Sequence, residues 1–229
     1  MKDQMTAFLL EGSPDDVTGS LTQVPTAQLP EGELTVRVHY SGINFKDALI
    51  ASGVRRMVRK LPHVPGVDLA GEVVEDQSGR CKAGQEVLVT GYDLGVSHWG
   101  GYAEYARMPS AWAHALPAGL SALEAMTLGT AGFTAMLSVL ALERNGLTPG
   151  NGPVLVTGAT GGVGSVAIAL LAAAGHAVTA SSGKPDMADY LRTLGASEIV
   201  PREAVVDAST KPLLAETWAG AVENAGGAT

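Results

Sequence analysis

The sequence of 229 residues predicts a two-part α/β fold, in which a barrel-like β domain precedes a doubly wound parallel sheet with helices on its faces. Three observations predict it. Short β-type runs separated by Gly and Pro fill the first half of the chain. A long apolar segment without proline follows Ser121, and after Pro149 strand-like and helix-like patterns alternate, which is typical of parallel βαβ units. We therefore expect two domains, residues 1–120 and 121–229.

The first domain is predicted to be mostly antiparallel, because its strand-like runs are short and closely spaced. In LTVRVHY (34–40), apolar residues alternate with polar ones, as a strand with one buried face requires. The predicted strands are TAFLLEG (6–12), LTVRVHYSGI (34–43), DLAGEVVED (68–76), QEVLVTG (85–91) and GYAEYARM (101–108).

The second domain is predicted to open with a buried connecting helix. Ser121 and Glu124 have the spacing of a capping box, in which two residues satisfy the first free N–H groups of a helix. The helix is expected to break near Gly129 and Gly132, because glycine weakens a helix interior. The elements that follow are a strand at 153–158, a helix at 163–174, a strand at 176–183, a helix at 187–195 and a strand at 197–201.

A glycine-rich turn joins the first strand of this second domain to its helix. The G-x-x-G-x-x-G spacing in this context predicts a dinucleotide site. Such glycines allow a tight turn, close approach of backbone N–H groups to a pyrophosphate, and helix packing against the strand. The helix N-terminus adds unpaired donors and partial positive charge. The predicted cofactor-binding residues here are Gly158, Thr160, Gly161, Gly162, Val163 and Gly164.

The end of the second parallel strand favours NADP(H) over NAD. An NAD site usually places Asp or Glu there, whereas this chain has Ser181, Ser182, Gly183 and Lys184. Hydroxyls and an ammonium suit a 2′-phosphate, and a carboxylate would repel it. Arg202, just past the third strand, is a weaker candidate for the same phosphate. The alternative is that Lys184 is an ordinary surface lysine.

Composition and charge exclude several classes of protein. The chain is 46% hydrophobic and 17% charged, which is globular rather than disordered. A formal net charge of −8 argues against nucleic-acid and anionic-membrane partners, since phosphates require clustered Lys and Arg. A lone cysteine, Cys81, excludes an internal disulfide and a cysteine-rich zinc site. With no leader-like start and no apolar run of about 20 residues, we expect a metal-free cytoplasmic protein.

Five motifs in order give the chain a family resemblance. They are GINFKDALIASG (42–53), PGVDLAGEV (65–73), HWGGYAEYARM (98–108), GTAGFTAM (129–136) and VTGATGGVGS (156–165). With these motifs the chain resembles the zinc-independent medium-chain dehydrogenase/reductases, and most of all their acrylyl-CoA reductase branch, often labelled quinone oxidoreductase-like. The resemblance implies a GroES-like catalytic domain, a Rossmann domain, NADPH in the cleft between them, and a homodimer. It also implies that Thr130 and Thr134 lie near the nicotinamide.

Two departures from the family pattern stand out. Phe45 occupies a position where this branch often has tyrosine beside the nicotinamide, so stacking remains without a hydroxyl. The final segment, WAGAVENAGGAT, is similar to the fourth parallel strand of the cofactor domain, beyond which family members continue. The expectation is therefore a fragment or an incompletely given chain.

The residues near the first motif suit reduction of a conjugated double bond. Hydride addition to such a bond gives an enolate, which hydrogen-bond donors alone can stabilise, whereas carbonyl reduction in the zinc-bearing relatives uses a metal. Asn44 is the predicted catalytic donor, with an Asx-type loop contact as the alternative. Asp47 is predicted to orient Lys46 or a water or to relay a proton, with a structural cap as the alternative.

The predicted substrate contacts are less specific. A basic cluster follows the first motif closely enough to meet the phosphorylated tail of coenzyme A, although charge runs are usually solvated faces. Trp99 lies in a glycine-flanked loop that would line the substrate cleft or fill a gap in the core. The predicted substrate residues are Arg55, Arg56, Arg59 and Trp99.

The sequence thus predicts an NADPH-dependent oxidoreductase that reduces an activated C=C bond. The expected substrate is a short enoyl-CoA such as acrylyl-CoA, which would become propanoyl-CoA. An NADPH-dependent quinone reductase is the alternative within the same class. A non-catalytic nucleotide-binding fragment is the alternative from another class.

Overall fold

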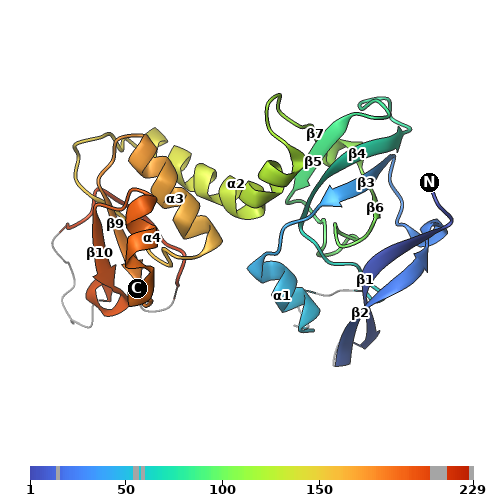
Figure 1. Cartoon of the computed structure of the whole chain (residues 1–229), viewed down its shortest axis with the longest axis horizontal. Helices are drawn as coiled ribbons and strands as arrows, with labels where there is room; N and C mark the ends of the chain where they lie inside the picture. The colour runs from blue at the N-terminus through green and yellow to red at the C-terminus, as the bar shows by residue number, and fades with distance from the viewer. Residues whose placement is uncertain (14–15, 54–56, 58–59, 207–215, 227–229) are drawn as a thin grey trace. The chain divides into compact units, whose positions relative to one another are not determined.

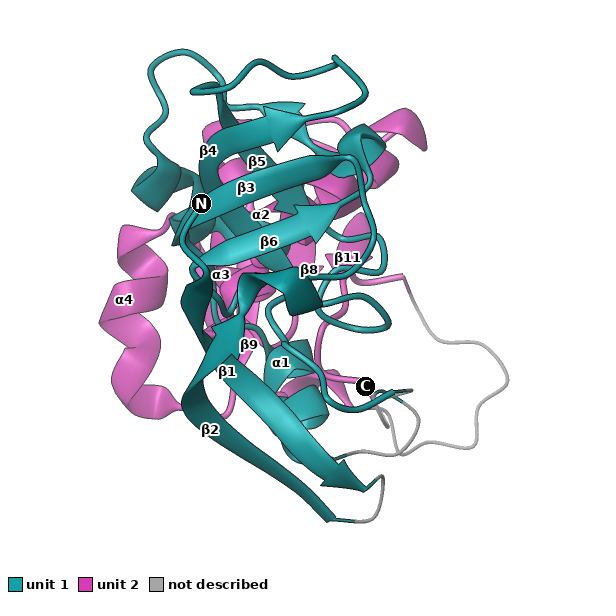
Figure 2. Cartoon of the chain, turned by 90° about the vertical axis from the view of Figure 1, so that its right-hand side faces the viewer, with its two compact units in different colours: residues 1–130 teal, residues 131–229 magenta. Residues whose placement is uncertain are grey.

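The computed structural model describes residues 1–13, 16–53, 57, 60–206 and 216–226 (Figure 1). The chain divides into two compact units, residues 1–130 and 131–229 (Figure 2). The dividing line falls inside the long helix, whereas the sequence prediction placed it just before that helix. Each unit has a hydrophobic core of its own.

Unit 1 is built mainly from antiparallel strands. β1 (Gln4–Ser13) and β2 (Asp16–Pro25) form a hairpin. Five further strands form a sheet in the order β6-β3-β4-β5-β7. They are β3 (Leu34–Tyr40), β4 (Asp68–Asp76), β5 (Glu86–Thr90), β6 (Tyr105–Met108) and β7 (His114–Ala115). All their pairings are antiparallel, which confirms the prediction for this part of the chain.

The sequence prediction missed β2 and β7. β2 consists largely of polar and small residues, and within it only Val24 is fully buried. It therefore has no apolar alternation to reveal it, and its backbone pairing with β1 holds it in place. β7 is only two residues long, too short for any periodic pattern.

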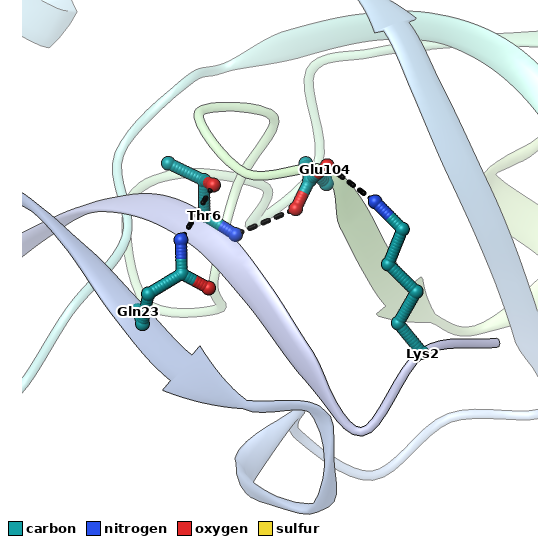
Figure 3. A network of polar contacts seen from close by, with 4 residues as sticks. All are labelled: Lys2, Thr6, Gln23 and Glu104. Atoms are coloured by element: carbon teal, nitrogen blue, oxygen red, sulfur yellow. Dashed lines mark hydrogen bonds and ion pairs between the residues drawn. The ribbon is translucent and has the colours of Figure 1, made fainter.

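Glu104 joins the hairpin to the segment that enters β6 (Figure 3). Its carboxylate accepts the backbone N–H of Thr6 at 2.7 Å, and its other oxygen lies 3.4 Å from the ammonium of Lys2. Gln23 of β2 donates to the Thr6 hydroxyl at 3.0 Å. The bond from Thr6, with a smaller contribution from Lys2, lowers the pKa of Glu104. The charged carboxylate thus holds β1 against the segment that enters β6.

The α-helices among the described residues of this part are α1 (Phe45–Ala51) and α2 (Ala122–Arg144), which crosses the dividing line. The predicted capping box is confirmed, since Ser121 N–H donates to the Glu124 carboxylate at 2.9 Å and Glu124 N–H to the Ser121 hydroxyl at 3.2 Å. The predicted break is confirmed at Gly129, whose φ is 49° and ψ −151°. Gly132 stays helical.

By length and composition alone, α2 is apolar enough to cross a membrane. The non-helical residue Gly129 divides it, however, so that neither helical part reaches the roughly 20 residues that a bilayer requires. Core helices of soluble proteins also pass this test. The apolar character of α2 is therefore weak evidence for a membrane span.

Unit 2 contains a four-stranded, wholly parallel sheet in the order β10-β9-β8-β11. Its elements are β8 (Val154–Val156), α3 (Gly162–Ala173), β9 (Val178–Ser182), α4 (Ala188–Thr193), β10 (Glu198–Pro201) and β11 (Gly220–Val222). The predicted alternation, including the fourth parallel strand, is confirmed. Buried Val154, Val156 and Val178 pack with Ile168 and Leu171 of α3.

The order of these strands indicates where a ligand would bind. Counted along the chain, the sheet runs third, second, first, fourth, so that strand succession reverses between β8 and β11. Connections diverge at such a switch point, and ligands of open α/β sheets bind beside it at the carboxyl ends of the strands.

Short 3₁₀ segments complete the described elements. They are η1 (Thr26–Gln28), η2 (Ser110–Trp112), η3 (Pro185–Met187) and η4 (Arg202–Val205).

Candidate functional site

The glycine turn of unit 2 lies at the carboxyl end of β8. Gly158 has φ +55°, a conformation that L side chains rarely adopt. A Cβ on Gly164 would lie 2.5 Å from the Gly158 carbonyl oxygen, so only glycine lets α3 approach the turn this closely. Gly161 is the N-cap residue, and α3 begins at Gly162. The turn therefore exposes backbone and a helix N-terminus, both of which suit an anion.

A pocket of about 300 Å³ opens beside this turn. It brings together six of the predicted cofactor residues, from the turn after β8, the end of β9 with the residues that follow it, and the start of η4. These are Gly158, Thr160, Ser182, Gly183, Lys184 and Arg202. Ser181, whose hydroxyl the sequence analysis also considered, lines it as well, as do Thr157 and Ala225, which that analysis did not select. The predicted Gly161, Gly162, Val163 and Gly164 do not line this pocket; they form the start of α3.

The charge of this pocket is positive. Lys184 and Arg202 are both exposed, and none of the described residues that line the pocket is acidic. The Ser182 hydroxyl accepts the N–H of Lys184 at 3.0 Å, which fixes the turn after β9. Two cationic side chains and neighbouring hydroxyls are therefore available to bind a phosphate here.

Thr157 ties the strands together on the other side of the pocket. Its hydroxyl donates to the Glu223 carboxylate at 2.7 Å and accepts the N–H of Asn224 at 2.9 Å, just after β11. The Asn224 side chain also donates to the Thr157 carbonyl at 3.0 Å. The sequence analysis missed Thr157, because its partners lie more than sixty residues away. The contacts hold the switch point between β8 and β11 in one geometry.

Unit 1 contains a second concentration of polar groups, around the wholly buried Asp68. Its carboxylate accepts the Gly42 N–H at 2.7 Å and the Asn44 side-chain amide at 2.9 Å. It also accepts the backbone N–H of Thr130 at 3.0 Å and the Thr130 hydroxyl at 2.8 Å. The Thr90 hydroxyl lies 2.9 Å from that of Thr130. The sequence analysis missed Asp68, although an Asp within the apolar run PGVDLAGEV is a usable signal.

Asp47 is buried, and both its oxygens accept backbone N–H groups. It accepts the Asn44 N–H at 2.9 Å at the start of α1, and the N–H groups of Gly66 and Val67 at 3.1 Å each. These contacts are those of the structural cap, which was the alternative reading of this residue. The proton relay through Asp47 stays a prediction.

Two aromatic residues accompany this network. The Tyr102 hydroxyl donates to the Gly42 carbonyl at 3.0 Å, and burial, with Asp47 and Asp68 nearby, raises its pKa. It therefore stays protonated at neutral pH. Phe45, the residue in the position where the family often has tyrosine, is 81% exposed at the first turn of α1. It leaves a large apolar ring available to a flat ligand.

The remaining predicted residues are scattered. Trp99 is half-buried against the cluster around Met5 and Leu9, and its indole N–H donates to the Pro62 carbonyl at 3.1 Å. In unit 2, the Thr134 carbonyl accepts the Ser138 hydroxyl at 2.9 Å within α2. Arg55, Arg56 and Arg59 lie outside the described residues.

Comparisons with known proteins show the family of the chain. Residues 30–118 match the alcohol dehydrogenase GroES-like domain. Acrylyl-CoA reductase AcuI of Ruegeria pomeroyi is 51% identical over 91% of this chain and 63% of its own length. Putative quinone oxidoreductase YhfP of Bacillus subtilis is 47% identical over 99% of this chain and 69% of its own length. The chain belongs to the zinc-independent medium-chain dehydrogenase/reductase family.

Solved structures of family members extend the likeness to both units. The yhdH oxidoreductase of Salmonella enterica, solved in complex with NADP, matches 97% of this chain and 68% of its own with a TM-score of 0.93 at 47% identity. YhfP, solved with NAD bound, gives a TM-score of 0.91. The chain spans about two thirds of the length of these relatives.

The match to the GroES-like domain of this zinc-independent medium-chain family covers residues 30–118. It covers Asn44, Asp68 and Thr90, whereas Thr130 and the glycine turn lie outside it. In the part of the chain that the structure describes, no three His, Cys, Asp or Glu side chains gather as a metal site requires. The polar groups around Asp68 are instead satisfied by one another.

Proposed function

We propose that this protein is an NADPH-dependent reductase of an activated C=C bond, acting on a short enoyl-CoA such as acrylyl-CoA to give propanoyl-CoA. The observation that carries the proposal is the pocket at the switch point of unit 2. Among the described residues that line this pocket, Lys184 and Arg202 are cationic and none is acidic. The relative named acrylyl-CoA reductase supports the choice of substrate.

The residues of the pocket fit a 2′-phosphorylated dinucleotide. The turn at Gly158 offers backbone without side chains to a diphosphate, and the first residues of α3 offer unpaired N–H groups. Ser182, Lys184 and Arg202 would hold the 2′-phosphate. The NADP complex of the yhdH relative supports this choice, while the NAD complex of YhfP makes direct comparison of the two coenzymes necessary.

NADPH, when bound, supplies the hydride that is added to the β-carbon of the substrate. In the proposal the Asn44 amide donates to the oxygen that becomes the enolate, which lowers the energy of the charge that develops there. The α-carbon then takes a proton. Phe45 would stack against a flat ring without offering a hydroxyl, and Thr130 and Thr134 are proposed near the nicotinamide.

The proposal also includes recognition of the coenzyme A portion of the substrate. We assign it to the basic residues Arg55, Arg56 and Arg59, with Trp99 as a further candidate at the substrate site. A soluble protein is supported by the bacterial oxidoreductases among the relatives, and a homodimer in the cytoplasm is proposed with it.

The test is NADPH oxidation followed by absorbance with acrylyl-CoA as acceptor, beside matched assays with NADH. We expect turnover with NADPH, and propanoyl-CoA formed in a one-to-one ratio to NADP⁺. Absence of turnover with the thioester under conditions where NADPH binds would overturn the proposed substrate.

Quinone reduction is the second candidate, favoured by the name of the YhfP relative. It uses the same coenzyme residues and differs in the acceptor alone. The assay with small quinones in place of acrylyl-CoA separates the two. Binding of NADPH without turnover of either acceptor would favour the non-catalytic nucleotide-binding alternative.

A further inference from the structure

The buried carboxylate of Asp68 receives four hydrogen bonds from neutral groups of two other segments. Gly42 and Asn44 precede or begin α1, and Thr130 lies on α2, while Asp68 itself opens β4. Its exposed fraction is 0%. Burying a charge in this way is costly unless the surrounding donors compensate, so the arrangement indicates a specific role for the carboxylate.

An ionised carboxylate only accepts hydrogen bonds, and this fixes the orientation of its neighbours. The Asn44 amide must turn its nitrogen toward Asp68, because its carbonyl oxygen at 2.9 Å would face another acceptor. The single hydroxyl proton of Thr130 is given to Asp68. In the 2.9 Å contact between Thr90 and Thr130, Thr90 is therefore the donor.

The same carboxylate also accounts for the break in α2. At Gly129 the backbone leaves the helical conformation, and the N–H of Thr130 is a donor at the start of the helical part that follows. Asp68 accepts that N–H, as a capping side chain does. A Cβ on Gly129 would lie 3.0 Å from the Asp68 carboxylate, so glycine also leaves room for the contact.

We propose that Asp68 is a positioning residue for Asn44: it takes one N–H of the side-chain amide and so presents the second N–H to the substrate oxygen. Asp68 does not itself touch the substrate. An amide nitrogen carries two N–H groups, and with one given to Asp68 the amide is fixed as a donor at the reacting position. This inference rests on the proposed function in assigning the enolate oxygen to Asn44.

A double-mutant cycle of Asp68→Asn and Asn44→Ala in the full-length protein tests the coupling. In the Asp68→Asn variant an NH₂ group replaces one carboxylate oxygen and meets existing donors, Gly42 in one orientation and Asn44 with Thr130 in the other, so the network that fixes the amide of Asn44 is disrupted. We expect Asp68→Asn to lower kcat by about 100-fold, as misplaced groups do, with the KM for NADPH unchanged. Asn44→Ala should cost a similar factor. The double variant should lose no more than Asn44→Ala alone.

The control is Asp76→Asn, which removes another hydrogen-bonded carboxylate of unit 1, one whose partners include Cys81 and Ser110 rather than Asn44. It should lower the melting temperature and leave the kcat of the folded protein unchanged. If Asp68→Asn reduces activity by the same factor in the Asn44→Ala background, Asp68 acts independently of Asn44 and the inference is wrong.

Two measurements without turnover keep this test separate from that of the proposed function. The side-chain amide protons of Asn44 in the NMR spectrum should be well separated and slowly exchanging in the parent and in Asp76→Asn, but not in Asp68→Asn. An absence of turnover in the parent protein together with these spectra would refute the proposed function and leave the positioning intact. Unaltered Asn44 signals in Asp68→Asn would refute the positioning.

Asn44→Asp covers the case in which Asp68→Asn does not fold. It places two carboxylates within hydrogen-bond distance, so they must share a proton and the pKa of the pair rises. Its stability, compared with that of the parent, should therefore be greatest at low pH and be lost as the pH rises. An equal stability deficit in mild acid and in mild base would show that the two side chains are not in contact.

Discussion

The nucleotide pocket of unit 2 and the Asp68 network of unit 1 are assembled in opposite ways. Most of the pocket comes from two short stretches, 157–160 and 181–184, each at the end of a strand of one sheet. The Asp68 network comes from residues 42 and 44 on one segment and from single residues at 68, 90 and 130 on three others. A site made of contiguous residues depends on local geometry, whereas a dispersed site depends on the packing of the whole unit.

The first prediction breaks the local geometry of the contiguous site. In Gly164→Val the new side chain would overlap the Gly158 carbonyl, since a Cβ alone would already lie 2.5 Å from it. We expect α3 to be pushed away from the turn and NADPH binding to become undetectable by fluorescence titration. Ser165→Val, at the neighbouring position on the same helix, is the control and should retain binding. Equal affinity in both variants would contradict the assignment of the pocket.

The second prediction sharpens the choice of coenzyme at the same pocket. Removing the ammonium in Lys184→Ala should weaken NADPH binding by about 10- to 100-fold, the range of a charge-assisted hydrogen bond. NADH binding should change little, because NADH has no 2′-phosphate. Lys82→Ala removes an exposed lysine of unit 1 and serves as the control. A parallel loss of affinity for both coenzymes would place Lys184 at the diphosphate or outside the site.

The same contrast explains what the sequence could predict. The strand, turn and helix around Gly158 follow one another in the chain, so their spacing identified the turn. The side chains that follow the next two predicted strands then gave Ser182, Gly183, Lys184 and Arg202. Asn44 was also selected, from a local motif. Asp68 and Thr90 could not be paired with it, because no periodicity relates residues that meet only through sheet and helix packing. β2 was missed for a similar reason, since pairing with β1 rather than its own burial defines it.

Asp76 combines both kinds of assembly, because it has partners nearby in the chain and one far away. The third prediction tests its contribution to stability. Its carboxylate accepts the N–H groups of nearby Ser78 at 3.0 Å and Cys81 at 2.8 Å, and the hydroxyl of distant Ser110. Burial opposes ionisation, but these hydrogen bonds outweigh it and lower the pKa of Asp76. Asp76→Asn should reduce the free energy of unfolding by about 1–3 kcal/mol in urea titrations at neutral pH.

The pH dependence of this effect has a definite sign. A lowered folded-state pKa stabilises the fold above the ordinary pKa of Asp, and this contribution is lost as the pH falls through the folded value. The stability difference between Asp76→Asn and the parent should therefore shrink in acid. A difference that stays constant into strong acid would contradict the role of the ionised carboxylate.

The smallest expected effect concerns His63, a buried residue of unit 1 whose Nε2 lies 2.8 Å from the carbonyl oxygen of Gly95. Burial, with His98 nearby, lowers its pKa from the ordinary 6.5, although the Gly95 carbonyl acts in the opposite sense. The folded protein therefore binds fewer protons than the unfolded chain just below pH 6.5. The stability from neutral His63 is complete above that pH and is lost as the pH falls through the folded value.

Substitution by glutamine tests this contribution. Gln places an amide N–H near the same carbonyl without titrating. The melting temperature of His63→Gln should therefore fall less than that of the parent between neutral pH and about pH 5. His39→Gln, at an exposed position, should follow the parent. If the melting temperature of His63→Gln falls with pH as steeply as those of the parent and of His39→Gln, His63 does not contribute to the acid sensitivity of the protein.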